Sequence, residues 1–242
     1  MNVPKRAIVL SAGLGVRMRP ITDRLPKPLV PVAGRTLLDR CLDRLDAAGV
    51  ETVVVNTFHL AALIERHLAA RRRPNIVISR EVELLDTGGG VAKALPDLLP
   101  GPFFAINSDA LWLDGAGDTL HRLADAWDDA RMDALLLLKP VELAAGYEGK
   151  GDFHLGTDGR LSRRAEGARA PFLYIGLQIL SPRLFAGVAV EKFSLNRLYD
   201  CAAASDRLHG LRHEGAYFHV GTPAAIALAE RGMAQLADGG VE

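Results

Sequence analysis

A segment near the N-terminus combines glycines and basic residues in a spacing that suits phosphate binding. The run LSAGLGVRMRPITDRLPKPLVP, residues 10–31, contains Gly13 and Gly15, then Arg17 and Lys27. Glycines let a backbone approach a ligand closely and expose successive N–H groups, and a guanidinium can grip two phosphate oxygens at once. Lys27 stands between two prolines, which stiffen the chain around the cation. The segment therefore predicts a phosphate-binding loop.

Two widespread phosphate-binding motifs do not fit this segment. A Walker A loop requires GxxxxGK[ST], which the sequence lacks. A dinucleotide fingerprint requires GxGxxG, and Met18 occupies the place of its third glycine. A plain turn with solvated arginines is the alternative, and the combination of two arginines with Pro-Lys-Pro argues against it. Arg19 itself is open to either interpretation, as a phosphate ligand or as a surface cation.

Alternating strand and helix patterns surround the loop and must position it. Apolar runs predict strands at residues 6–10, 52–56, 75–79, 103–107, 134–138, 172–180, 207–212 and 216–220. Helical periodicity predicts helices at residues 36–48, 60–70, 88–98, 117–131, 195–204 and from 222 onward. This alternation predicts an α/β fold with a doubly wound, mostly parallel sheet. Ligands of such sheets bind at the carboxyl ends of the strands. Residues 140–171, rich in glycine and charge, are expected to cross the sheet's active edge without forming a separate domain.

The composition excludes several functional classes. The chain has 242 residues, 29 Lys+Arg and 29 Asp+Glu, a formal net charge of zero and 49% hydrophobic residues. This balance excludes a strongly basic nucleic-acid surface and an acidic disordered tail. The apolar run at residues 7–10 is too short for a signal peptide or a membrane span. Cys41 and Cys201 form no CxxC pair, and we expect both to be small core residues of a cytoplasmic protein.

The positive charge is concentrated at one end of the chain. Residues 1–40 contain eight cations against two carboxylates, a net charge of +6, and the remaining 202 residues carry −6. The cationic segment contains the predicted phosphate loop. Because the rest of the chain offsets it, long polyanions such as nucleic acid are not expected partners.

Five further motifs follow the loop along the chain. They are ExExLDTGGG at residues 81–90, Asn107-Ser108-Asp109, GKGDF at residues 149–153, Tyr174-Ile175-Gly176 and Val220-Gly221-Thr222. With the N-terminal run, they resemble in order the motifs of the sugar-1-phosphate nucleotidylyltransferases, from residue 6 to about 225. Within that family, the LDTGGG loop, the GKGDF segment and the small size are most similar to the uridylyltransferases of N-acetylmuramate 1-phosphate.

The resemblance implies a fold, a reaction and partners. It implies one nucleotidyltransferase domain of the glycosyltransferase-A-like type over residues 1–242, with a nucleotide-binding part over about 1–139 and a sugar-binding part over about 140–220. The reaction would join a nucleoside triphosphate to a sugar 1-phosphate and release pyrophosphate, with Mg²⁺ as cofactor. The sugar phosphate is itself anionic, so the reaction needs positioning and charge neutralisation more than a general base. We expect a monomer with no membrane partner.

The same resemblance assigns roles to individual residues. Nucleotide contacts are expected from Leu10, Ser11, Ala12, Gly13, Gly15, Arg17, Lys27, Glu81, Gly88 and Asn107. Among them, Arg17 would neutralise the β- and γ-phosphates, and Lys27 would hold the α-phosphate and the sugar phosphate. Asp109 would hold Mg²⁺, a hard ion that prefers oxygen ligands. The base would be read by Glu81. Sugar contacts are expected from Gly151, Gly176 and Asn196.

Each assignment has a plain structural alternative. Asp109 could be a turn residue after a strand, and Glu81 a solvated loop charge. Gly151 and Gly176 could form a bulge or a turn. The competing functions are a hexose or heptose 1-phosphate guanylyl- or thymidylyltransferase and, from another class, a non-catalytic nucleotide-sugar binding module.

Two positions depart from the family pattern. Ser108 replaces a glycine, which is a small change. His219 stands where the family has a second metal-binding Asp, and strand alternation puts it on one face with Tyr217. Imidazole is a poor ligand for Mg²⁺ and a better one for zinc and other softer ions. Three roles for His219 stay open: a metal ligand alongside Asp109, a contact to phosphate or metal-bound water, or packing.

Overall fold

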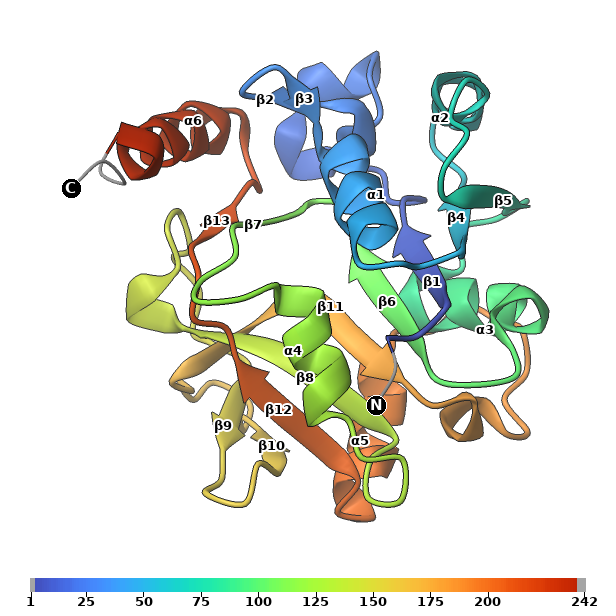
Figure 1. The fold of residues 1–242 in the computed structure, drawn as a ribbon, viewed down its shortest axis with the longest axis vertical. Helices are drawn as coiled ribbons and strands as arrows, with labels where there is room; N and C mark the ends of the chain where they lie inside the picture. Colours follow the sequence, from blue (N-terminus) through green and yellow to red (C-terminus); the bar gives the residue numbers. More distant parts are fainter. Residues whose placement is uncertain (1–2, 239–242) are drawn as a thin grey trace.

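Apolar, β-branched runs form the parallel half of a central sheet (Figure 1). The computed structural model describes residues 3–238, and within them the sheet has nine strands. Four strands pair in parallel in the spatial order β6 (Phe103–Asn107), β1 (Arg6–Leu10), β4 (Thr52–Thr57) and β5 (Asn75–Arg80). Their carboxyl ends therefore lie at one edge of the sheet.

The second half of the sheet begins at a strand of opposite direction. β11 (Phe172–Leu180) runs antiparallel to β6 and to β8 (Ala134–Pro140), and β8 pairs in parallel with β12 (Leu208–Arg212). The short strands β9 (Phe153–Leu155) and β10 (Leu161–Arg163) extend the sheet beside β11. The segment at residues 140–171 thus adds two short strands to the sheet, which the sequence interpretation did not predict.

Helices cover both faces of the sheet. One face packs against α1 (Leu37–Ala47), α2 (Ala61–Leu68) and α4 (Thr119–Ala126), and the other against α3 (Asp86–Leu98) and α5 (Asn196–Ala204). The buried stripe of α1 consists of the predicted residues Leu37, Leu38, Cys41, Leu42 and Leu45. Burial of such stripes from both sides gives a three-layer arrangement. The prediction of a doubly wound, mostly parallel α/β fold is confirmed.

A third hydrophobic cluster lies beneath the N-terminal loop. The loop carries the 3₁₀ turns η1 (Val16–Met18), η2 (Ile21–Asp23) and η3 (Lys27–Leu29), and the hairpin strands β2 (Pro31–Val32) and β3 (Arg35–Thr36). The ribbon β7 (Ala110–Trp112)–β13 (Tyr217–His219) and the helix α6 (Pro223–Asp238) pack against it. The outer turns are η4 (Val141–Leu143) and η5 (Pro182–Phe185). This cluster joins the loop to the C-terminal part of the chain.

Two local expectations differ from the structure. The helix predicted at residues 117–131 ends at Ala126, because the buried Trp127 adopts an extended backbone conformation. Cys201 is exposed, since α5 buries Leu198, Tyr199 and Ala202 and Cys201 lies off that face, whereas Cys41 is buried as expected. Among residues 3–238, no helix combines the length and apolar character needed to cross a membrane.

Candidate active site

The carboxyl ends of β1, β4 and β6 open into a cleft of about 380 Å³. The N-terminal loop forms one wall, and residues that follow β6 form another. Many of the predicted site residues line this cleft: Leu10, Ser11, Ala12, Gly13, Gly15, Arg17, Lys27, Asn107 and Asp109. Segments separated by about eighty residues in the chain thus meet at the sheet edge where ligands of such folds bind.

Hydrogen bonds hold the N-terminal loop in shape. The Ser11 backbone N–H donates to the Asn56 side chain at 2.7 Å, which ties the loop to the end of β4. Gly15 has a φ of +60°, and its carbonyl accepts from the Thr22 hydroxyl at 2.8 Å. A Cβ at Gly15 would lie 2.9 Å from Thr22 Cγ2, so both the conformation and the space require glycine. Met18, fully buried, anchors the loop from below.

The two predicted phosphate-binding cations differ in their partners. Lys27 forms an ion pair with Asp109, and the two side chains are 12% and 34% exposed. Arg17 lines the cleft and forms no ion pair with any residue in 3–238. The guanidinium of Arg17 is therefore available to an anionic ligand, whereas Lys27 would have to be shared between Asp109 and a ligand.

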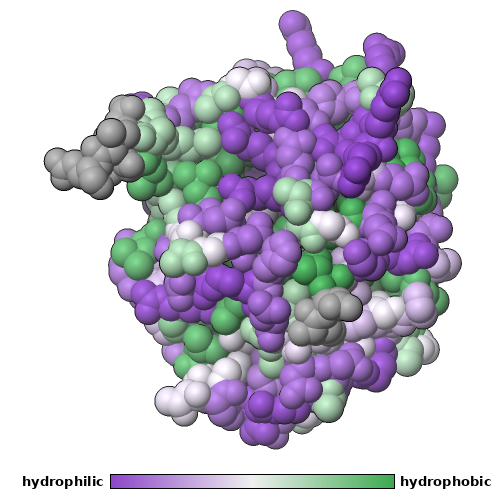
Figure 2. All heavy atoms as spheres, viewed as in Figure 1, coloured by the Kyte–Doolittle hydropathy of each residue, from purple (hydrophilic) through white to green (hydrophobic). Residues whose placement is uncertain are grey.

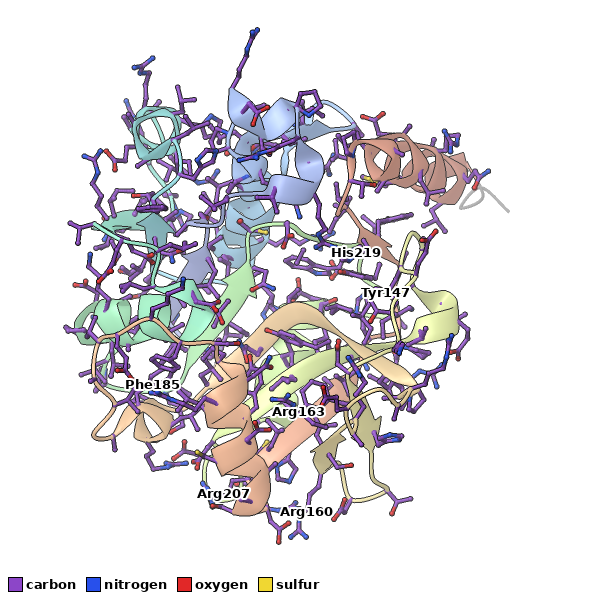
Figure 3. All side chains as sticks on the ribbon, turned by 180° about the vertical axis from the view of Figure 1, so that it is seen from behind. Tyr147, Arg160, Arg163, Phe185, Arg207 and His219 are labelled. Carbon is purple, nitrogen blue, oxygen red and sulfur yellow. The ribbon has the colours of Figure 1, made fainter. Side chains whose placement is uncertain are left out.

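The β7–β13 ribbon brings His219 beside Asp109. Asp109 directly precedes β7, and the antiparallel register sets His219 opposite Ala110. The Tyr217 hydroxyl lies 3.4 Å from His219 Nδ1, which confirms that these two residues share one face of the strand. Burial lowers the pKa of His219, although the Asp109 carboxylate acts in the opposite direction. Tyr147 packs edge-on against the His219 ring at 5.7 Å (Figure 3).

Of Asp109 and His219, only Asp109 has a side chain that suits Mg²⁺. The Asp109 carboxylate is a hard oxygen ligand at the cleft wall, as Mg²⁺ prefers. His219 offers nitrogen, which does not suit this ion. In the described part of the chain, no group of three or more His, Cys, Asp or Glu residues could hold a metal ion. Protein ligands alone therefore do not form a complete magnesium site here.

Glu81 has a structural role that the sequence interpretation did not predict. It is 5% exposed, and both carboxylate oxygens accept hydrogen bonds within the protein. Oε1 accepts from Asn56 Nδ2 at 2.7 Å, and Oε2 accepts from the Leu85 backbone N–H at 3.0 Å. Because Asn56 in turn holds Ser11, Glu81 supports the loop at residues 82–85 and the phosphate loop together. Glu81 is not among the residues that line the cleft, and its contact with the base stays a prediction.

Gly88 supports the cleft from behind. Its backbone N–H donates to the Phe193 carbonyl at 2.9 Å, and a Cβ there would lie 2.2 Å from the Phe193 ring. The neighbouring Thr87 lines the cleft, and its hydroxyl accepts from the Leu195 N–H at 3.0 Å. Glycine at position 88 is thus needed for packing of α3 against residues 193–195, and the predicted nucleotide contact stays a prediction.

The three residues predicted to contact the sugar are not among the residues that line the cleft. Gly176 is closest to it: it has a φ of +82°, sits at an irregularity in β11, and lies against the Asn107 side chain. Gly151 has a φ of +73° and approaches the Ala170 carbonyl, where a Cβ would lie 2.1 Å away. Asn196 begins α5 and is exposed. Contact of these residues with a sugar stays a prediction.

Several cleft residues were missed by the sequence interpretation. They are Val16, Met18, Pro28, Asn56, Leu84, Asp86, Thr87, Ser108, Lys192 and Gly221. Asn56 could have been predicted from the sequence, because a polar residue at the end of an apolar parallel strand lies at the sheet edge where ligands bind. Lys192 could not: it lies in a loop with no local pattern and reaches the cleft only through the tertiary fold.

Solved nucleotidyltransferases share this fold. A UDP-glucose pyrophosphorylase complexed with UDP-glucose superposes with a TM-score of 0.78 at 17% identity, covering 96% of this chain and 99% of that one. HddC from Yersinia pseudotuberculosis complexed with GMP-PN superposes with a TM-score of 0.75 at 20% identity, covering 94% and 99%. These likenesses show that this chain has the same fold as the two solved proteins.

Sequence relatives give the family. Residues 7–144 match the MobA-like NTP transferase domain. The chain is 45% identical over 239 residues to N-acetylmuramate alpha-1-phosphate uridylyltransferase of Caulobacter vibrioides, covering 97% of this chain and 99% of the relative. It is 32% identical to the Neisseria meningitidis enzyme of the same name, covering 90% and 93%. The chain belongs to the MobA-like NTP transferases, as a sugar-1-phosphate nucleotidyltransferase.

Proposed function

We propose that the protein transfers a uridylyl group from UTP to N-acetylmuramate 1-phosphate, forming UDP-N-acetylmuramate and releasing pyrophosphate. The observation that carries the proposal is the convergence of Arg17, Lys27 and Asp109 on one cleft. The choice of substrates is supported by the 45% identity, over nearly the whole of both chains, to an enzyme named for this reaction. We further propose that it acts as a monomer in the cytoplasm, in the recycling of peptidoglycan.

The side chains of the cleft suit an in-line attack of one phosphate on another. The sugar phosphate would attack the α-phosphorus of UTP, and the bond to the β-phosphate oxygen would break. Two anions must approach each other for this step, so fixed cations lower the barrier. Arg17 would receive the charge of the leaving pyrophosphate. Lys27, held beside Asp109, would sit between the α-phosphate and the sugar phosphate.

A divalent metal ion belongs to this proposal. The Asp109 carboxylate would hold Mg²⁺, and oxygen atoms from the substrate phosphates and water would complete its coordination. Bound there, the ion would neutralise phosphate charge. Asp109 would then exchange its ion pair with Lys27 for the metal ion and leave Lys27 free to turn towards phosphate.

A panel of substrates tests the proposal. Pyrophosphate release would be measured with UTP, GTP, dTTP and CTP, each combined with N-acetylmuramate, N-acetylglucosamine, glucose or mannose 1-phosphate, with and without chelator. We expect the largest kcat/KM for UTP with N-acetylmuramate 1-phosphate, and loss of release with chelator. A preference for GTP with mannose 1-phosphate would favour a hexose 1-phosphate guanylyltransferase. Absence of release with every pair would favour a non-catalytic nucleotide-sugar binding module.

A further inference from the structure

We propose that His219 binds a phosphate oxygen of the nucleotide by donating a hydrogen bond from Nε2, next to Arg17, and that it is not a metal ligand. The inference rests on the proposed function, because it requires a triphosphate in the cleft. It concerns the position where this chain has an imidazole in place of the family's second metal-binding carboxylate.

The placement of the ring gives the first argument. The Nε2 edge of His219 lies against Gly221, where a Cβ would be 2.7 Å from Nε2 and 3.4 Å from a terminal nitrogen of Arg17. Gly221 and Arg17 both line the cleft. The absence of a side chain at Gly221 thus makes room for the imidazole, and its Nε2 edge lies near the Arg17 guanidinium, which has no ion-pair partner within residues 3–238, beside the cleft.

The tautomer gives the second argument. Nδ1, on the opposite side of the ring, faces the buried Tyr217 hydroxyl at 3.4 Å, the one hydrogen-bond partner recorded for that hydroxyl within residues 3–238. A phenol keeps its proton at neutral pH, and a buried O–H needs an acceptor. Tyr217 therefore donates to Nδ1, which leaves the hydrogen of the neutral ring on Nε2. A protonated Nε2 has no lone pair for a metal ion and is a donor for an anion.

The supports of the ring give the third argument. Tyr147 packs edge-on against His219 with a ring-centroid distance of 5.7 Å (Figure 3). The His219 backbone N–H donates to the Ala145 carbonyl at 2.9 Å, and the Ala145 N–H donates to the Tyr217 carbonyl at 3.2 Å. The segment that carries Tyr147 is thus bound to β13, and the imidazole is fixed in direction before a ligand arrives. A fixed donor of this kind orients a phosphate that Arg17 attracts by charge.

The experiment measures binding of pyrophosphate and of Mn²⁺ separately. Pyrophosphate would be titrated calorimetrically in the presence of chelator, and Mn²⁺ would be titrated without nucleotide and followed by electron paramagnetic resonance. The variants are His219→Ala, which removes the donor, and His219→Gln, whose amide nitrogen can take the place of Nε2. Arg17→Ala serves as the reference for a phosphate ligand, and thermal unfolding checks that each variant is folded.

The inference predicts opposite responses from the two titrations. His219→Ala should weaken pyrophosphate binding by about tenfold or more, the worth of one hydrogen bond to a charged group, while His219→Gln stays within about threefold of the unmodified protein. Mn²⁺ binding should be the same in the unmodified protein, His219→Ala and His219→Gln. Unchanged pyrophosphate binding in His219→Ala would overturn the inference, with loss of Mn²⁺ binding indicating a metal ligand and no change indicating packing. Absence of pyrophosphate binding by the unmodified protein, both with chelator and with added Mg²⁺, would instead reject the triphosphate cleft and the proposed function with it.

Discussion

Arg17 is the residue on which the phosphate chemistry depends most, because no partner within residues 3–238 neutralises it. We expect Arg17→Ala to lower kcat/KM for pyrophosphate release by about 10²–10³, the usual cost of removing one charge-stabilising donor from an active site. Arg19→Ala is the matched control. Arg19 is two residues away, is 61% exposed and pairs with Asp23, so its removal should leave the rate within about twofold. Equal losses in both variants would mean that the loop acts through its net charge and not through Arg17.

Residues that act within the N-terminal loop were predictable from the sequence. Glycines and arginines at short spacing are enough to predict a phosphate-binding loop. Nine of the residues predicted for the site, in this loop and after β6, line the cleft. Glu81 shows the limit of this reasoning. Its role depends on Asn56, 25 positions away in sequence, which reaches both Glu81 and Ser11. A sequence pattern can indicate that a carboxylate follows a strand, but not that both of its oxygens are already bonded.

At the scale of elements, β11 joins the parallel half of the sheet to its second half. It borders β6 on one side and β8 and β9 on the other, and its irregularity lies between Tyr174 and Gln178. Gly176, inside this irregularity, lets the strand approach Asn107 at the end of β6. The irregular shape of β11 therefore affects the position of Asn107, which lines the cleft.

Substitution of Gly176 separates the effect of its contact with Asn107 from the effect of backbone strain at a positive φ. Gly176→Ala should destabilise the fold by about 1 kcal/mol, since φ is +82°, and should also lower kcat/KM because the new methyl would lie 3.0 Å from Asn107 Cβ. Gly187→Ala is the control, with a φ of +72° and no atom within 4 Å of the new methyl. Thermal unfolding should show similar losses of stability in both variants, and only Gly176→Ala should lose activity. Equal activity in the two would show that the contact with Asn107 has no catalytic consequence.

The long elements were predictable, and most of the short ones were not. The strands of the parallel half and helix α1 lie within a residue or two of their predicted bounds, because burial from one or both faces imposes a periodic pattern. The strands β7, β9 and β10 have three residues each, too few for such a pattern. The β7–β13 pairing joins residues more than a hundred positions apart, and it is this pairing that brings His219 beside Asp109.

At the scale of the whole molecule, half of the cations in residues 1–40 form ion pairs within the protein. Four of the eight cations form ion pairs with residues in the described part of the chain: Lys5 with Glu51, Arg19 with Asp23, Lys27 with Asp109, and Arg35 with Asp43. Hydrophilic side chains gather around α1 on the face shown in Figure 2. Arg17 lines the cleft and forms no ion pair within residues 3–238, so its positive charge is available there to an anionic ligand.

The stability of the molecule should depend on pH through His209 in β12. His209 is 2% exposed, and neither ring nitrogen has a hydrogen-bond partner in the described part of the chain. Burial lowers its pKa below the ordinary value of about 6.5. Below that pH the unfolded chain takes up a proton that the folded protein does not, so the stability present above about pH 6.5 is lost as the pH falls.

Replacement of His209 by leucine should remove part of that loss. We expect His209→Leu to unfold about 2–4 °C above the unmodified protein at pH about 5.5, with a smaller difference at pH about 8. His154→Leu, at an exposed position in β9, is the control and should show no pH-dependent gain. His213, also buried and with its pKa lowered by burial, is left in place and retains its share of the acid sensitivity. A gain for His209→Leu that is the same at both pH values would exclude proton uptake as its cause.

The central claim is that Asp109, with the cations around it, makes this cleft a uridylyltransferase active site. Its most direct test is the rate of pyrophosphate release from UTP and N-acetylmuramate 1-phosphate by the unmodified protein and by Asp109→Asn. The substitution keeps the size of the side chain and removes the charge that pairs with Lys27. We expect stoichiometric release of pyrophosphate and UDP-N-acetylmuramate by the unmodified protein and a loss of about 10²-fold or more in the variant. Equal rates in the two proteins, or no release by either, would contradict the account.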